Sequence, residues 1–175
     1  MGQTADTIVA SANLTLIYAQ QLLKDIKAEQ FARRPVVGGT VIETNHPAFV
    51  YGHLSLYARR AAAAVGRESA VAPHPAGFEG LFKNGVACQD DPSGTIYPSM
   101  QAITEYYFAA TKAAVEAVRG ADEAVFARPN PAEGRMKELF PTIGGAVNFY
   151  LGAHSMSHLG QVSAWRRCVG LGSAM

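Results

Sequence analysis

The sequence predicts an all-α protein, a four-helix bundle with a long crossover between the second and third helices. Apolar residues recur at steps of three and four along four long segments, the spacing of one face of a helix. No run shows the alternation expected of a strand, and one stretch rich in proline and glycine separates the second segment from the third. The 175 residues, of which 49% are hydrophobic, suit a single domain over 1–175 with one sizeable core.

The first two helices are expected over about residues 4–30 and 45–66. The apolar face of the first comprises Val9, Ala12, Leu16, Ala19, Leu23 and Ile26. The second begins at Asn45, a favourable N-cap residue, and has Pro47 in its first turn. Its stripe comprises Phe49, His53, Leu56, Arg60 and Ala63, and Gly66 is the expected C-cap.

The crossover is expected over about residues 67–96, where turn residues are concentrated. One short helical turn is predicted at 78–82. A loop of this length in a compact domain is usually functional or flexible. The third helix is expected from Pro98 to Gly120, and its face comprises Met100, Ile103, Tyr107, Ala110, Ala114 and Val118.

The fourth helix is expected from Thr142 to just before Gly170. Arg166 and Arg167 fall in its last turn, where positive charge complements the helix dipole. We interpret both as last-turn charges.

Composition excludes several classes of protein. The formal net charge is +1 and no basic stripe is present, which argues against nucleic-acid binding. Every apolar stretch is interrupted before it could cross a bilayer, so we expect no membrane segment. Cys88 and Cys168 do not form a CxxC pair, and no signal peptide is recognisable. A cytoplasmic location is therefore expected.

Three histidines are predicted to point into the bundle. On a helical wheel, His154 and His158 differ by only about 40°, and Gln161 and Trp165 follow on the same stripe. His53 occupies a position that its apolar neighbours mark as buried. The face argument therefore brings three imidazoles from two helices together.

A divalent metal ion would satisfy all three rings at once. Each buried imidazole has two nitrogens that need partners, and an ion accepts a lone pair from each ring. The i,i+4 spacing lets two histidines of one helix share an ion, and three protein ligands leave positions open for chemistry. Zinc, nickel, copper and iron all suit three imidazoles. The alternatives are that the pair on the last helix consists of two surface histidines or of two core histidines bonded to carbonyl groups.

Two motifs together resemble those of the DinB/YfiT-like family of metal-dependent helical proteins. They are "HPAFVYGHLSLY" at 46–57 and "HSMSHLGQVSAWRRCVGL" at 154–171. The resemblance spans all four helices. It implies an up-down-down-up bundle, a homodimer, and a divalent ion (zinc, nickel or iron) held by His53, His154 and His158. Characterised relatives include transferases and isomerases that depend on a low-molecular-weight thiol. The crossover is longer than in a compact family member, and its role stays open.

Transfer of a thiol to a small-molecule substrate is the leading function. A metal-dependent hydrolase and a non-enzymatic metal-binding or small-molecule-binding stress protein are the alternatives.

Gln161 is placed to hydrogen-bond a ligand histidine, or it merely continues the packed stripe. His46 lies too far from His53 to share an ion, and a role in the first turn of its helix is favoured over one at a pocket mouth. Arg60 reaches the bundle end or offers a site to an anion, of which the former is favoured. No general base is evident.

Overall fold

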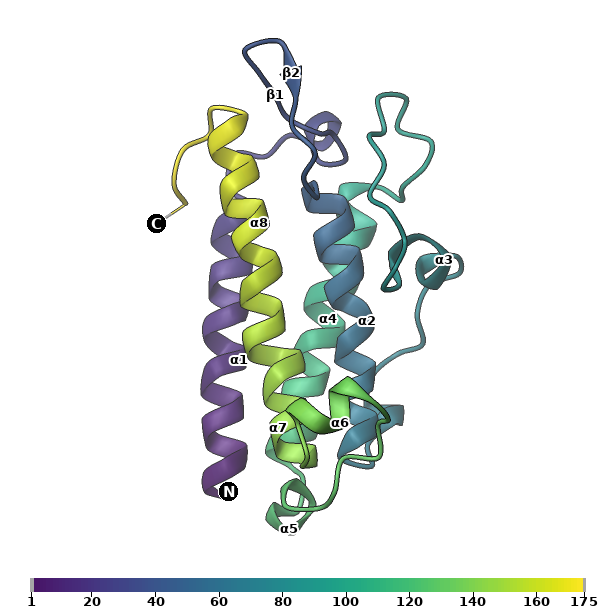
Figure 1. Ribbon diagram of the computed structural model, residues 1–175, viewed down its shortest axis with the longest axis vertical. Helices are drawn as coiled ribbons and strands as arrows, with labels where there is room; N and C mark the ends of the chain where they lie inside the picture. Colours follow the sequence, from purple (N-terminus) through teal and green to yellow (C-terminus); the bar gives the residue numbers. More distant parts are fainter. Residues whose placement is uncertain (1, 175) are drawn as a thin grey trace.

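The computed structural model describes residues 2–174 and is an all-α bundle (Figure 1). Its long helices are α1 (Gln3–Leu22), α2 (Pro47–Ala64) and α4 (Met100–Arg119). The fourth long helix is made of three consecutive parts: α7 (Ile143–Asn148), a π-helix (Phe149–Ala153) and α8 (His154–Cys168). The shorter elements are 3-10 turns at Ala28–Gln30 and Glu68–Ala70, strands β1 (Val36–Val37) and β2 (Thr40–Val41), and helices α3 (Phe78–Phe82), α5 (Glu123–Phe126) and α6 (Arg135–Leu139).

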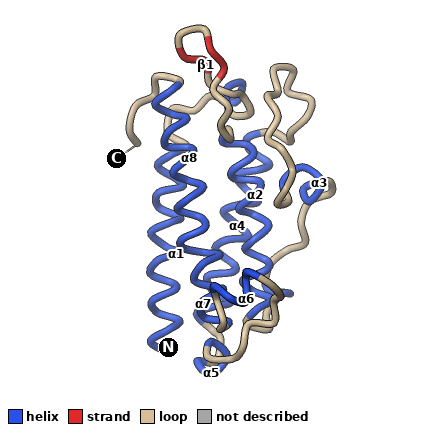
Figure 2. The backbone as a smooth tube through the Cα atoms, viewed as in Figure 1, coloured by secondary structure: helices blue, strands red, loops and turns tan. Residues whose placement is uncertain are grey.

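The helix directions give the expected up-down-down-up order (Figures 1 and 2). Helices α2 and α4 run side by side in the same direction, because residues 65–99 return along the length of the bundle. The prediction of four helices and a long crossover is confirmed. The antiparallel pair β1–β2 was not expected. It is only two residues long on each side, with Val36 opposite Val41, and its side chains are exposed.

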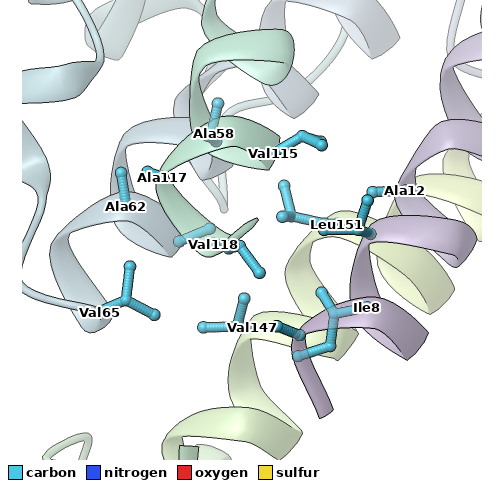
Figure 3. Close-up of a cluster of buried hydrophobic side chains, with 14 of the residues drawn as sticks. Ile8, Ala12, Ala58, Ala62, Val65, Val115, Ala117, Val118, Val147 and Leu151 are labelled. Carbon is cyan, nitrogen blue, oxygen red and sulfur yellow. The ribbon is translucent and has the colours of Figure 1, made fainter. Parts of the chain in front are cut away.

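The buried side chains form two clusters that divide the bundle along its axis. One is built of small and aliphatic residues, including Ile8, Val118 and Leu151 (Figure 3). Alanines at the α2–α4 contact allow these parallel helices to approach closely. The other cluster is aromatic and includes Tyr51 and Trp165. Fully buried rings of this size contribute strongly to stability, so the aromatic half holds α2 and α8 in a fixed relation.

The first helix ends earlier than expected, at Leu22 rather than near residue 30. Asp25 has a positive φ of 61°, which breaks the helix.

The interpretation of Arg166 as a simple last-turn charge was wrong. Its side chain is 2% exposed, and its guanidinium donates hydrogen bonds to the carbonyl oxygens of Leu22, Lys24 and Leu171. Arg166 therefore caps the C-terminus of α1 from another helix.

The start of α2 also differs from the prediction by one residue. The N-cap is His46, whose Nδ1 accepts the Phe49 backbone N–H at 3.2 Å. Asn45 precedes it, and its side-chain amide is used elsewhere. The short turn expected at 78–82 is present as α3. No helix among residues 2–174 has the length and apolar character needed to span a membrane.

Candidate metal centre

The three predicted histidines converge between α2 and α8. One potential ligand atom from each of His53, His154 and His158 lies within 4.8 Å of the other two. The ring centroids are 5.3 Å apart for His53 and His154, 4.7 Å for His53 and His158, and 4.6 Å for the pair on α8. Residues separated by a hundred positions are thus brought together by the fold.

Hydrogen bonds fix the orientation of two of the rings. His53 Nδ1 donates to the carbonyl oxygen of Phe82 at 2.7 Å, so its Nε2 carries the lone pair. His158 Nδ1 lies 3.3 Å from Oε1 of Gln161, which also accepts from Nδ2 of Asn45 at 2.9 Å. Metal-binding histidines commonly donate the N–H of the ring nitrogen that does not bind the metal to an oxygen in this way, which fixes the tautomer and the ring plane.

His154 is the least satisfied of the three. Its Nδ1 is buried and has no hydrogen-bond partner among residues 2–174. Its Nε2 faces Nε2 of His53 at 3.4 Å. When the proton of His154 lies on Nδ1, both facing nitrogens carry lone pairs and repel each other, and a cation between them would reverse the sign of that interaction. The donor set and its outer hydrogen bonds therefore fit a divalent ion.

The environment keeps all three rings neutral, the form that donates a lone pair. Burial, together with the nearby His158, His53 and Arg60, lowers the pKa of His154 to about 3. Burial also lowers the pKa values of His53 and His158. At neutral pH no proton has to leave these rings before they can coordinate an ion.

Close packing at Gly52 sets the position of His53. The ring of Phe82 lies against this glycine, and a Cβ there would be 2.5 Å from its ring carbons. The absence of a side chain lets Phe82 approach α2 closely enough for its carbonyl oxygen to reach His53. The glycine of the Gly52-His53-Leu54 motif thus has a packing role beside the histidine.

A π-helix lies directly before the histidine pair of α8. It ends at Ala153, directly before His154, and π-helical turns often occur at functional sites. The hydroxyl of Ser155 donates to the carbonyl oxygen of Tyr150 at 3.0 Å. Gly152 lies against α1, where a Cβ would be 2.7 Å from Oγ of Ser11. The wide turn is therefore held by both its own helix and a neighbour.

A cavity of about 610 Å³ opens onto the histidines. Its walls come from α2, from residues 83–88 of the crossover, from Met136 of α6 and from the π-helix and α8. The crossover, whose role the sequence left open, therefore supplies one wall. The lining residues are Asn45, Phe49, His53, Tyr57, Arg60, Lys83, Asn84, Gly85, Val86, Ala87, Cys88, Met136, Phe149, Tyr150, His154 and His158.

The structure also shows where the other candidate residues lie relative to this cavity. His46 is fully buried away from it, and its Nε2 donates to the carbonyl oxygen of Gln89 at 2.8 Å, so its role is structural. Gln161 contacts His158 as the stripe suggested. Sequence reasoning missed the Phe82 carbonyl and the amide of Asn45. A main-chain group carries no residue signature, and Asn45 was assigned to the helix cap.

Comparison with known proteins agrees with this architecture. No significant match was found among curated proteins or among solved structures. The family model described as the DinB superfamily matches residues 17–162, a range that includes the three histidines and Gln161. Because this match covers most of the sequence, including the whole first motif and the histidine pair of the second, the chain belongs to the DinB superfamily.

Proposed function

We propose that the protein is a metal-dependent enzyme that acts on a small molecule, with His53, His154 and His158 holding one divalent ion. The observation that carries the proposal is the convergence of three neutral imidazoles at the wall of a 610 Å³ cavity. Two of them have Nδ1 within hydrogen-bond distance of an oxygen, which leaves Nε2 free for the ion, as in metal-binding histidines. Zinc, nickel and iron are the candidates.

A divalent ion with open coordination positions lowers the pKa of a bound water or thiol, which supplies a nucleophile at neutral pH. The chain's own residues perform the remaining tasks. Phe82 and Gln161 orient two rings through hydrogen bonds. Phe49, Tyr57 and Phe149 line the cavity with aromatic surface that excludes water from the reacting groups.

Thiol transfer to a small electrophile is the proposed reaction. The sulfur of the thiol forms a bond to a carbon of the electrophile, the leaving group departs from that carbon with its electron pair, and the thiol proton passes to solvent. No described residue that lines the cavity carries a carboxylate that could accept a proton from attacking water. A thiol ionises far more readily than water and needs less help from a base. This observation favours transfer over hydrolysis. Non-enzymatic binding is the third possibility.

Metal analysis of protein purified without an affinity tag is the first test. We expect close to one equivalent of metal in the parent and little in His158→Ala, while His74→Ala, outside the cavity, retains it. Circular dichroism checks that each variant is folded. Absence of metal after zinc, nickel and iron have each been offered would refute the site.

The loaded parent is then assayed for loss of free thiol with small alkyl and aryl halides. Consumption of thiol that requires the three histidines supports transferase activity. Ester or amide hydrolysis without thiol consumption would favour the hydrolase. A bound metal whose removal unfolds the protein, with no turnover of either kind, would favour a non-enzymatic role.

A further inference from the structure

The mouth of the histidine cavity carries positive charge only. Among the described residues that line it, the charged ones are Arg60 and Lys83, and none is acidic. Both side chains belong to exposed residues at the rim, Arg60 on α2 and Lys83 directly after α3. A cavity with cations at its mouth and no opposing carboxylate attracts anions.

Arg60 is held in place without using its hydrogen-bond donors. Its Cζ lies 4.8 Å from the ring centroid of Tyr57, a cation–π contact. Tyr57 in turn packs against His154, with ring centroids 4.1 Å apart. Among residues 2–174, no carboxylate lies within ion-pair distance of Arg60, whereas its neighbour Arg59 pairs with Glu68 at 2.8 Å. The guanidinium is thus oriented and free to donate.

The spacing suits a ligand that reaches both ends of the cavity. Arg60 follows His53 by seven residues on the same stripe, about 10 Å along the helix axis. An arginine side chain on a helix leans toward the N-terminus, which brings its head back over Tyr57 and toward the histidines.

We propose that the cavity binds a small molecule through a carboxylate held by Arg60, with Lys83 adding to the attraction, while the reactive end of that molecule lies at the histidines. The planar guanidinium offers paired N–H donors that match the two oxygens of a carboxylate. This inference rests on the proposed function for the reactive end. The carboxylate subsite itself requires only the residues of this chain.

The subsite is tested first on the metal-free protein by NMR. Glutarate is titrated while the side-chain Nε–H resonances of the arginines are followed, with neutral glutaramide as the matched probe. We expect a saturable shift of the Arg60 resonance with glutarate and none with glutaramide. Arg59, already paired with Glu68, is the internal control. Equal shifts for the two arginines, or no shift of Arg60, would overturn the inference whether or not the protein binds metal.

The second test uses cobalt-loaded protein and two thiols of the same length, 3-mercaptopropionate and 3-mercaptopropionamide. Thiol binding is read from the thiolate-to-cobalt absorption. We expect the carboxylate to bind about tenfold more tightly, and Arg60→Gln but not Arg59→Gln to remove the difference. Equal affinity in the parent, or a preference that survives Arg60→Gln, contradicts the subsite. A failure of cobalt to bind instead refutes the proposed metal site, and the NMR result then decides the subsite alone.

Discussion

Replacing Gly52 by alanine tests whether packing against α2 positions the candidate metal ligand. The added Cβ would lie 2.5 Å from three ring carbons of Phe82, so the ring and its carbonyl must move away. Overpacking of this kind costs about 1–3 kcal/mol, and the better helix propensity of alanine returns about 1 kcal/mol. We therefore expect Gly52→Ala to lose up to about 2 kcal/mol of stability in the metal-free protein.

The same substitution should weaken metal binding, because His53 loses the carbonyl that fixes its ring. Loss of such an outer partner typically costs about 10-fold to 100-fold in affinity. Urea unfolding and competition with a chelating indicator measure the two effects. Gly160→Ala is the matched control, since this helical glycine on α8 has open space around its Cβ position and should gain slightly in stability. Parent-like stability and affinity in Gly52→Ala would refute the reasoning.

Three further predictions concern stability and its dependence on pH. Arg166→Met should lower the free energy of unfolding by about 3–5 kcal/mol because main-chain carbonyls lose their donor, whereas Arg167→Met, on an exposed residue, should change it by less than about 0.5 kcal/mol in chemical denaturation. His46→Ala should cost about 1–2 kcal/mol through loss of the N-cap and leave metal content unchanged, and a fall in metal content would contradict its structural role. The pKa of His154 is about 3 in the folded protein, against an ordinary value of 6.5 for histidine in an unfolded chain. Between these two pH values the unfolded chain therefore binds more protons than the folded protein. The metal-free protein should therefore lose stability as pH falls from 6.5 toward 3, and His154→Asn should show a shallower loss in urea titrations at each pH.

Periodicity predicted the bundle because it reports which face of a helix is buried. The stripe on the third helix is an example, with Ile103, Tyr107 and Val118 all buried. The same argument placed His53 and the α8 pair in the interior, and the structure brings the three rings together. Such predictions need only the repeat of a single helix, together with the rule that apolar faces pack against each other.

Features that depend on partners distant in sequence could not be predicted. Arg166 has the local signature of an exposed last-turn charge, yet its partners are carbonyl groups at the end of α1. Asn45 has the signature of a helix cap, yet its amide holds Gln161 across the bundle. The π-helix before His154 leaves no mark on apolar spacing, and it is accompanied by a close contact of Gly152 with α1. In each case the deciding interaction crosses between elements.

The histidine cluster stabilises the fold less than an apolar core would, and this is the strongest physical reason to assign it a function. The protons on Nδ1 of His53 and His158 are committed to carbonyl oxygens. If the one proton of His154 lies on Nδ1, two lone pairs face each other at 3.4 Å and the buried N–H has no partner among residues 2–174. If it lies on Nε2, the buried Nδ1 has an unused lone pair. Either state leaves a buried polar group unsatisfied, at a cost of about 1–3 kcal/mol. Conflicts with folding rules of this kind concentrate at functional sites, and a cation accepting the facing lone pairs resolves the larger part of this one.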